Sequence, residues 1–587
     1  MLRKISLTVA LIVLVGGFFV LNSENGYSAK RPVGEQSQAQ TPRKASSVAA
    51  QRNILSGMVT DPQGFAIAGA RVRIPGLDDF LLTDELGMFQ RLLVEPWLQH
   101  VEVFVTAGKE GWLNGGARSN PLQRNIRIIL QKVPDFDDPL YQTMITSPIS
   151  SRIQRSQRDC ANCHTTHMWE WGASKMGKTV RNERVLASYK KLQKTISTRQ
   201  ANTCADCHAP IAAQKAPGQT DLAWAFSGGN LSNGIECDFC HKIRDVQVDN
   251  RSGVQKIESN RITLGRGMMS PILVSGPYDD TVNMVMAASY NPLYSKSEFC
   301  SACHQNAVSL PENSSWDPNS IYPEADQYPL YEDGQVVPDQ WTYQEWLEWQ
   351  NSLPENAENK GQQCQDCHMN WTKNMMPYYR YVVSGNVRRS MGTERSPKSI
   401  YPHKFEGATP SRLTGSVNLQ VQSMQEEGTL SVQVGVTNVN AGHRLPTGEH
   451  SRNMILLVSA EDEDGSPLDF QDGSVVPAWG GFGGGKTDYA GLAGKGFARI
   501  TVDGNGTINV PVWQAAAIQS DNRIKPAQTD LSEYKFKVPE GRDEEIFFIT
   551  ATLIYRKSFP ENDADMGWEP EEIIMKEKTI ESGDGGL

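Results

Sequence analysis

Residues 160–164 read Cys-Ala-Asn-Cys-His, and this Cys-x-x-Cys-His spacing occurs five times in the chain. The five copies use all 10 cysteines, which are Cys160, Cys163, Cys204, Cys207, Cys237, Cys240, Cys300, Cys303, Cys364 and Cys367. The histidines that follow the pairs are His164, His208, His241, His304 and His368. Because no cysteine is left over, a structural disulfide is excluded and the motifs account for every thiol.

Two kinds of site use paired cysteines at this spacing, zinc sites and covalently bound haem. Zinc takes four ligands, usually from two such pairs, whereas here the number of pairs is odd and each is followed at once by histidine. In c-type haem attachment, two thiols form thioethers with the porphyrin and the adjacent histidine reaches the iron. The sequence therefore predicts five covalently attached haem c groups, and with them a dependence on a haem attachment machinery.

The N-terminus has the layout of a secretory signal. Met-Leu-Arg-Lys precedes an apolar run over residues 5–21, and polar and small residues follow. We predict a signal peptide over 1–29, with an uncleaved membrane anchor through 5–21 as the alternative, because the run is at the short end of a spanning helix. Residues 30–53 are polar and lack periodicity, so a flexible linker is expected. The protein is predicted to be exported, to the periplasm or the cell surface.

Composition indicates a globular protein of several domains. The chain has 587 residues, 39% of them hydrophobic and 21% charged, and its formal net charge is -10. A net negative charge excludes nucleic acid as the expected partner, because phosphate binding needs an excess of clustered positive charge. Haem propionates would add further negative charge, so we expect redox protein partners that are basic at the contact.

Periodicity divides the rest of the chain into three regions. Alternating apolar residues broken by Asp-Pro and Gly turns predict a small β-sandwich over 54–133 and a second, C-terminal β-sandwich over 415–587. The region 134–414 holds all five motifs and shows few long periodic runs, so it is predicted to be a loop-rich, mostly α multihaem domain. Short helices are expected at 185–194 and 343–349.

The sixth ligand of each iron separates an electron carrier from an enzyme. His167, His403 and His443 are the favoured histidine ligands. His167 is too close to His164 to reach the other face of the same haem, and His443 lies in a Gly- and Pro-flanked loop. His100, on an alternating strand, and His450, on a loop, are predicted to be structural. Methionine can also ligate, and the candidates are Met176 and Met286.

Several short runs together resemble an exported multihaem cytochrome c family related to the tetrahaem electron acceptor of hydroxylamine oxidoreductase. They are Cys-Ala-Asn-Cys-His followed by Trp171-x-x-Ser-x-Met, Gly-Ile-Glu-Cys-Asp-Phe-Cys-His-Lys, Gly276-Pro-Tyr-Asp-Asp, Ser297-Glu-Phe-Cys-Ser-Ala-Cys-His, Thr342-Tyr-Gln-Glu-Trp-Leu and Gly442-His-Arg-Leu-Pro-Thr-Gly. The resemblance implies that His403 and His443 are distal ligands. Where many relatives have histidine, this chain has Met176, Met286 and Tyr294, which leaves one or two irons Met-ligated or open.

The N-terminal region resembles the carboxypeptidase regulatory-like domain, through Ile54-Leu-Ser-Gly-Met-Val-Thr-Asp-Pro-Gln-Gly and Thr83-Asp-Glu-Leu-Gly-Met-Phe. That resemblance implies a binding or structural module without catalysis.

Electron transfer outside the cytoplasmic membrane is the predicted function. One alternative is an enzyme that acts on a small nitrogen or sulfur species at one open iron, although no Cys-x-x-Cys-Lys motif is present. Another is a scaffold subunit of a respiratory complex. Residues 480–487 satisfy the phosphate-loop pattern, but Pro477 precedes them and further glycines follow, so a loop without nucleotide binding is predicted.

Overall fold

We describe the protein from a computed structural model. It covers residues 54–74, 77, 79–94, 102–120, 123–134, 160, 164–195, 198–216, 218–227, 234–248, 255–259, 272–283, 286–309, 336–370 and 400–583. The predicted signal and linker, His100 and Cys163 lie outside these residues. The chain divides into two compact units, Met1–Arg52 and Asn53–Leu587, and all of the described residues belong to the second. Of the helices in the described ranges, none is long and apolar enough to cross a membrane.

The N-terminal region consists of two small sheets. The first has the order β4 (Met88–Leu92), β1 (Ile54–Thr60), β7 (Arg124–Ile129), and the second has the order β3 (Leu81–Leu82), β2 (Arg71–Arg73), β5 (Val103–Gly108), β6 (Gly115–Ser119). Both sheets contribute to one buried cluster, which includes Leu55, Phe89 and Ile126 of the first sheet and Val72 and Val105 of the second. Alternation of buried and exposed residues along β1 thus directs one face of the strand into this core.

Aspartate and glycine form the turns of this region, as the sequence predicts. Asp61 Oδ1 accepts a hydrogen bond from the Phe65 N–H at 2.8 Å, and Asp84 Oδ1 accepts one from the Met88 N–H at 2.8 Å. Gly87 has φ 71°, and a Cβ at this position would lie 2.5 Å from the Val59 carbonyl oxygen. Glycine is therefore required there both by the turn and by the close approach of β1.

The middle region contains short helices, short 3₁₀ turns and two-stranded sheets. In order, its elements are α2 (Thr165–Ala173), η4 (Thr179–Arg181), α3 (Glu183–Leu192), α4 (Thr198–Ala201), α5 (Cys204–His208), α6 (Pro210–Lys215), α7 (Leu222–Phe226), α8 (Cys237–Cys240), β8 (Ile243–Val248), β9 (Gln255–Ser259), β10 (Ile272–Gly276), β11 (Met286–Tyr290), η7 (Pro292–Ser295), α9 (Glu298–His304), β12 (Asn306–Ser309), β13 (Val336–Gln340), α11 (Thr342–Ser352) and α12 (Cys364–His368). Strands β8 to β13 pair within this region as three two-stranded sheets.

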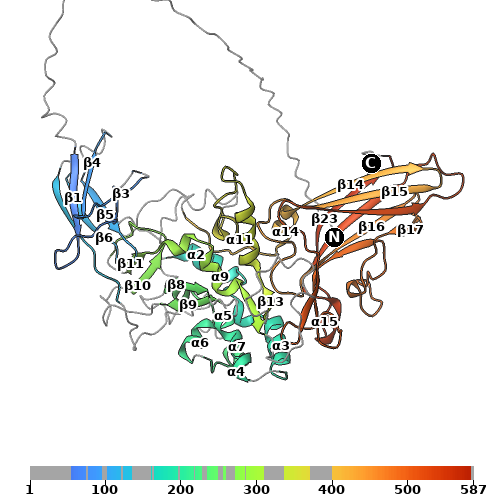
Figure 1. Cartoon of the computed structure of the whole chain (residues 1–587), viewed down its shortest axis with the longest axis horizontal. Coiled ribbons are helices and arrows are strands. Elements are labelled where there is room, and N and C mark those ends of the chain that lie inside the picture. Colours follow the sequence, from blue (N-terminus) through green and yellow to red (C-terminus); the bar gives the residue numbers. More distant parts are fainter. Residues whose placement is uncertain are drawn as a thin grey trace, which may run out of the picture. The chain divides into compact units, whose positions relative to one another are not determined.

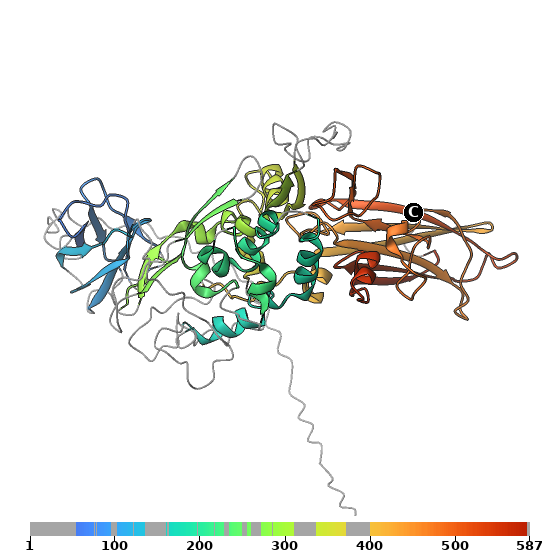
Figure 2. The same ribbon diagram turned by 90° about the horizontal axis from the view of Figure 1, so that it is seen from below.

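The loop-rich character of this region agrees with the prediction. Helix α11 includes the whole of the predicted segment 343–349, and α3 overlaps the predicted segment 185–194 but ends at Leu192. It is poorer in helix than a mostly α domain, because the helices are short and share the region with paired strands (Figures 1 and 2). One apolar cluster of its described residues is rich in alanine, including Ala201, Ala205, Ala209 and Ala212. Small side chains bury little apolar area of their own, so these alanines contribute little to the hydrophobic stabilisation of the cluster.

The C-terminal region is rich in β-structure. Its elements are α14 (Pro410–Ser416), β14 (Val417–Glu426), β15 (Thr429–Asn438), β16 (Asn453–Glu461), β17 (Phe470–Gly473), η11 (Ala478–Gly480), β18 (Gly494–Phe497), β19 (Arg499–Val502), β20 (Ala517–Asp521), β21 (Thr529–Lys537), β22 (Phe548–Arg556), α15 (Pro560–Asp565) and β23 (Glu572–Glu581). Two four-stranded sheets have the orders β14-β15-β21-β17 and β18-β16-β22-β23, and β19 pairs with β20.

Long antiparallel pairings hold these sheets together, and their inner faces share a core. Strand β15 pairs with β14 and β21, and β22 pairs with β16 and β23. Val434 and Tyr534 of one sheet and Leu456, Leu553 and Met575 of the other belong to the same buried cluster. The β-rich character predicted for both ends of the chain is confirmed.

Two features of the C-terminal region lie apart from the cysteine motifs. After the 3₁₀ turn η11, which ends at Gly480, residues 481–487 form a loop, and the next element among the described residues is strand β18 and not a helix, as the sequence predicts. Arg556 donates from Nη1 to the Gly480 carbonyl oxygen at 2.8 Å.

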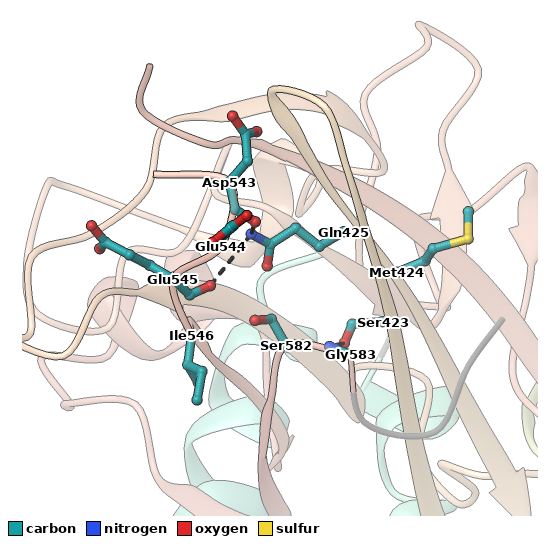
Figure 3. Close-up of a pocket in the computed structure, with 9 residues that line it drawn as sticks. All are labelled: Ser423, Met424, Gln425, Asp543, Glu544, Glu545, Ile546, Ser582 and Gly583. Atoms are coloured by element: carbon teal, nitrogen blue, oxygen red, sulfur yellow. Dashed lines mark hydrogen bonds between the residues drawn. The ribbon is translucent and has the colours of Figure 1, made fainter. Parts of the chain in front are cut away.

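A shallow hollow of about 390 Å³ is lined by Ser423, Met424, Gln425, Asp543, Glu544, Glu545, Ile546, Ser582 and Gly583 (Figure 3).

Candidate functional site

The Cys-x-x-Cys-His motifs lie on single helical turns. Helices α5, α8, α9 and α12 each contain or begin a motif, and the His164 N–H donates to the Cys160 carbonyl oxygen at 2.8 Å as in a helix. Residues three and four apart on a helix share one face. The helical turn therefore presents two thiols and an imidazole on one side, which is the arrangement that attachment of one haem needs.

Three of the motifs, the second, the fourth and the fifth, lie next to one another. The side chains of Cys207 and Cys303 interact, as do those of Cys300 and Cys364, and each interaction raises the pKa of the first-named thiol. Ser297, the N-cap residue of α9, precedes the fourth motif, and its Oγ accepts a hydrogen bond from the Cys364 N–H of the fifth motif at 2.9 Å.

Tyr294 joins the third motif to the fourth. Its hydroxyl donates to the Cys240 carbonyl oxygen at 2.6 Å, and its ring lies 4.7 Å from that of Phe299 in α9. The second, third and fifth motifs are thus all connected to the fourth.

One pair of histidine rings joins the third motif to a segment after the last motif. His241 and His403 have ring centroids 6.3 Å apart and planes inclined by only 19°. With a metal–nitrogen bond of about 2 Å and a centroid about 1.1 Å behind the nitrogen, two imidazoles on opposite sides of one metal have centroids about 6.2 Å apart. The separation of His241 and His403 fits one iron between them.

A second pair has nearly the same geometry. The rings of His368, from the fifth motif, and His443, from the loop before β16, have centroids 6.3 Å apart and planes inclined by 13°. The two pairs come from different segments of the chain, and only the motif histidines His241 and His368 share a sequence context. Their agreement in distance and angle fits the haem groups predicted from the sequence at the third and fifth motifs.

All four of these rings are oriented by a backbone carbonyl. Nδ1 of His241, His403, His368 and His443 lies 2.8, 2.9, 2.6 and 3.0 Å from the carbonyl oxygens of Ser275, Tyr401, Glu406 and Arg444, respectively. A carbonyl oxygen only accepts, so each Nδ1 carries the proton and each Nε2 keeps its lone pair. Metal-ligating histidines are typically held this way, with the second nitrogen donating to a carbonyl or carboxylate.

Burial keeps these imidazoles neutral. Burial, with help from the neighbouring His241, lowers the pKa of His403 to about 3, and burial lowers the pKa of His241, His368 and His443 as well. Only a neutral imidazole has a free nitrogen lone pair, so the shifts favour metal binding at neutral pH.

His164 and His167 lie beside the first pair. The His167 ring is 4.7 Å from that of His403 at 87° and 6.1 Å from that of His164 at 78°. His164 and His167 are three residues apart at the start of α2, so they point to the same side and cannot ligate one iron from opposite faces. His167 Nδ1 is buried without a hydrogen-bond partner among the described residues. The structure thus brings His167 into the histidine cluster of the first and third motifs.

For His208 and His304, no second imidazole stacks opposite the ring in the ranges that the structure describes. In the structure the Gln340 Nε2 amide nitrogen, a donor, lies 3.0 Å from His304 Nδ1, which would then be the acceptor. An iron-bound His304 requires the oxygen of that amide to face Nδ1, so that Nδ1 donates and Nε2 is free.

The residues that replace histidine in this chain have structural partners. Met286 begins strand β11 and pairs with Ile272 of β10, and Met176 lies in the turn after α2, where its carbonyl oxygen accepts from the Thr179 hydroxyl at 3.1 Å. The Tyr294 hydroxyl also donates to the Ile243 carbonyl oxygen at 3.1 Å, and its ring stacks 5.6 Å from His241. Tyr294 therefore packs beside a motif histidine and its oxygen is already used.

One buried group that the sequence did not reveal fixes the His443 loop. Glu345 of α11 is 3% exposed and accepts from the Arg444 N–H at 3.2 Å and the Thr447 hydroxyl at 2.7 Å. It also pairs with Arg523, whose Nη1 lies 2.8 Å from Glu345 Oε1. Only its place in the Thr-Tyr-Gln-Glu-Trp-Leu run, quoted above for its resemblance, marked this residue in the sequence.

Residues 159–242, which include the first three motifs, match the family described as cytochrome c554 and c-prime. Among solved structures, a crystal structure of a penta-haem cytochrome c552 from Thermochromatium tepidum covers 72% of this chain and 97% of that chain, at 17% sequence identity and a TM-score of 0.47. No curated protein matches the chain. The family match, together with the motifs, supports a multihaem cytochrome c.

Proposed function

We propose that the protein is a pentahaem c-type cytochrome that transfers electrons outside the cytoplasmic membrane. The observation that supports this most directly is the pair of ring arrangements, His241 with His403 and His368 with His443, each at 6.3 Å. Bound haem supplies one-electron oxidation and reduction at its iron. Where the chain offers two imidazoles to one iron, no position is left for a substrate, and electron exchange is the chemistry that remains.

The chain's own residues orient the ligands and bring the motifs together. The four carbonyl groups on Nδ1 fix the ring planes, and the contacts from the second, third and fifth motifs to the fourth place neighbouring centres close to one another. His164 and His167 connect the first motif to the third through the ring of His403. All five motifs thus form one connected group, as electron hopping from haem to haem requires.

The two β-rich ends have different roles in this proposal. The N-terminal region is a carboxypeptidase regulatory-like β-sandwich, and Arg71 of β2 pairs with the buried Asp279 at 2.8 Å, which attaches it to the haem region. The C-terminal region is a second β-sandwich, and it supplies His443 as a ligand. Both are part of the electron carrier and not independent modules.

The chain is exported and acts in the periplasm or at the cell surface, as the N-terminal apolar run and the attachment chemistry support. Its redox partners are basic at the contact, because the chain carries a formal net charge of -10 before any propionates are added.

A second candidate function is catalysis on a small nitrogen or sulfur species at one open iron. It is favoured by the absence of a second imidazole ring paired with that of His304 among the described residues. Binding of cyanide to one haem per chain in the oxidised protein would support this function, and an unchanged spectrum would exclude it.

The proposed function is tested on the purified oxidised protein by haem quantification and low-temperature electron paramagnetic resonance. We expect five haems per chain and mainly low-spin ferric signals. His403→Ala and His443→Ala should each convert about one haem to a high-spin form, because each removes one axial ligand. Fewer than five haems, or spectra that neither substitution alters, would contradict the proposal.

A further inference from the structure

Arg499 is a buried arginine with most of its hydrogen-bonding capacity unused. It lies on β19 and is 1% exposed, and its Nη2 donates to the Asp339 carbonyl oxygen. Nε and Nη1 are buried and have no hydrogen-bond partner in the part of the chain that the structure describes. A guanidinium group has only donors, so these two nitrogens need acceptors. Buried donors without acceptors are rare and call for an explanation.

Two buried carboxylates near Arg499 are already used by another arginine. Asp521, opposite Arg499 in the pairing of β19 with β20, accepts from Arg523 Nε at 2.8 Å and pairs with its Nη2 at 2.7 Å. Glu345 Oε1 lies 2.8 Å from Arg523 Nη1, and its other oxygen is bonded to the His443 loop. Among the described residues, neither carboxylate forms an ion pair with Arg499.

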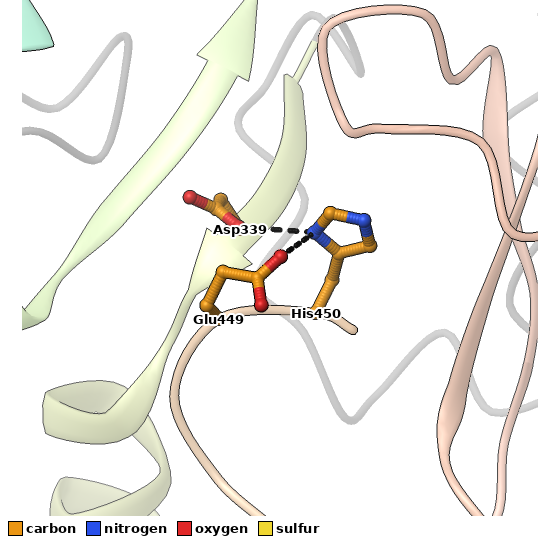
Figure 4. A group of neighbouring side chains, drawn as sticks. All are labelled: Asp339, Glu449 and His450. Atoms are coloured by element: carbon orange, nitrogen blue, oxygen red, sulfur yellow. Dashed lines mark hydrogen bonds and ion pairs between the residues drawn. The ribbon is translucent and has the colours of Figure 1, made fainter. Parts of the chain in front are cut away.

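The carboxylate of Asp339 faces a different cation. His450 Nδ1 lies 3.4 Å from Asp339 Oδ1 and 2.8 Å from Glu449 Oε1, and both carboxylates face this one ring nitrogen (Figure 4). Burial by itself would lower the pKa of His450, but Glu449 and Asp339 raise it to about 9. His450 is therefore protonated at neutral pH and pairs with these carboxylates. Asp339 offers Arg499 only its carbonyl oxygen.

Strand β13 connects Arg499 to the fourth motif. Asp339 is followed by Gln340, whose side-chain amide nitrogen lies 3.0 Å from His304 Nδ1. Strand β12 begins directly after the fourth motif, and its Asn306 pairs with Gln340. The guanidinium group of Arg499 thus contacts the strand that packs against the histidine of this motif.

A haem brings one kind of acceptor to such a place. Its ring nitrogens bind the iron and most of its edge is apolar, so its propionate carboxylates are its hydrogen-bond acceptors. Hydrogen bonds between a guanidinium group and a carboxylate are charge-assisted and are stronger than those between neutral groups. The unused donors of Arg499 therefore fit a propionate of a haem attached beside β13.

We propose that Arg499 donates hydrogen bonds to a propionate of the haem attached at the fourth motif and compensates the charge of that carboxylate. The inference rests on the proposed function, because it requires a haem at this motif. The C-terminal region then contacts two haems, one through His443 and one through Arg499. A positive charge beside a haem disfavours its ferric state, so Arg499 should raise the potential of this haem.

The test uses the full-length protein with its haems. Arg499→Met replaces the guanidinium group by an uncharged side chain of similar length. At a fixed applied potential, the ratio of ferrous to ferric protein should fall about tenfold for one haem. For one electron this corresponds to a potential lower by about 59 mV. Spectroelectrochemical titration measures it, with haem quantified in the same sample.

Arg118→Met is the matched control. Arg118 is 77% exposed and pairs with the exposed Glu102, so its loss should leave all five potentials unchanged. Unchanged potentials in Arg499→Met with five haems still bound would overturn this inference and leave the proposed function intact.

Arg499→Lys keeps the inference falsifiable if the methionine variant does not fold. Lysine keeps the positive charge but lacks the planar arrangement of donors. The potentials should therefore change much less than in Arg499→Met, whereas the propionate carboxylate band in the redox-induced infrared difference spectrum should move. An unmoved band would show that Arg499 does not bond to a propionate and would overturn the inference.

A four-haem variant identifies the haem that Arg499 contacts. In a Cys300→Ala/Cys303→Ala protein, which lacks the fourth attachment site, adding Arg499→Met should shift no potential. A shift there would place Arg499 beside a different haem and overturn the assignment to the fourth motif. A wild-type protein with fewer than five haems would instead count against the proposed function.

Phosphate tests whether a free anion occupies the site. Added at constant ionic strength, it should leave the potentials of the wild-type protein unchanged, because the proposed acceptor is part of the haem. A saturable shift that disappears in Arg499→Met would assign these donors to a free anion and overturn the inference.

Discussion

Gly442 precedes His443, the ligand proposed for the fifth motif, and faces the indole of Trp349 in α11. A Cβ at this position would lie 2.4 Å from Trp349 Cζ3 and 2.5 Å from Cε3, which is closer than side-chain carbons approach one another. Because glycine has no side chain, the loop that contains His443 can approach helix α11 closely. The absence of a side chain at Gly442 therefore helps to determine where the imidazole of His443 lies.

Gly442→Ala should displace either the indole or the His443 loop. We expect a partial high-spin signal from one haem and a loss of about 1–3 kcal/mol in the free energy of unfolding, the usual cost of overpacking. Paramagnetic resonance and denaturant unfolding measure the two effects.

Gly415→Ala is the matched control. Gly415 lies in α14, and a Cβ there would meet no atom within 4 Å, so the substitution should be neutral or slightly stabilising. Equal effects of the two substitutions would show that contact with Trp349 does not position the loop.

Helix α11 and the segment after β20 hold the His443 loop between them. Glu345 lies at the centre, bonded to the Arg444 N–H and the Thr447 hydroxyl and paired with Arg523. Arg523 also pairs with Asp521 at 2.7 Å. Because these groups are buried, removing one charge leaves its partner uncompensated.

Glu345→Gln should cost roughly 3 kcal/mol of stability, the lower end for breaking a buried ion pair. It should also loosen the His443 loop and so increase the high-spin fraction. Glu355→Gln is the control, since Glu355 is 92% exposed and its pair with Lys360 should contribute less than about 1 kcal/mol. A Glu345→Gln protein as stable as wild type would contradict this account.

The same pair makes stability depend on pH. Burial by itself would raise the pKa of Glu345, but Arg523 and the other nearby cations hold it below 4.5. Its contribution is therefore fully present above about pH 4.5 and is lost as the pH falls below that value. The difference in unfolding free energy between wild type and Glu345→Gln should shrink between pH 5 and pH 3, and a constant difference would exclude Glu345 as its source.

Elements with a local cause could be predicted from the sequence. Alternation predicted the strands of β15, β16 and β22, and Asp and Gly predicted the turns at Asp61 and Asp84. The distal partners depend on packing between distant segments, so His403 and His443 could be nominated but not assigned to an iron. The carbonyl oxygens of Ser275 and Tyr401 are backbone atoms, so no residue type in the sequence marks them.

At the scale of the whole molecule, net charge controls encounters with partners. A chain with a formal net charge of -10 attracts basic proteins over distances that salt shortens. The Debye length falls from about 30 Å at 0.01 M to about 10 Å at 0.1 M salt.

The rate of electron exchange with a basic protein donor should therefore fall about tenfold over that range of salt. Stopped-flow kinetics measure it, with a small uncharged reductant as the control whose rate should not change. A rate that stays constant or rises with salt would rule out a basic partner surface.

Two of the residues that hold the His443 loop, Arg523 and Ile524, come late in the chain. Leu445 pairs with Ile524, and Glu345 pairs with Arg523, so the loop is fixed only when the C-terminal region is present. A polypeptide exported N-terminus first delivers all five cysteine pairs before that segment emerges. On the proposed function, thioether formation at Cys364 and Cys367 can thus precede the arrival of His443, and coordination at the fifth motif would be one of the last events in the biogenesis of the protein.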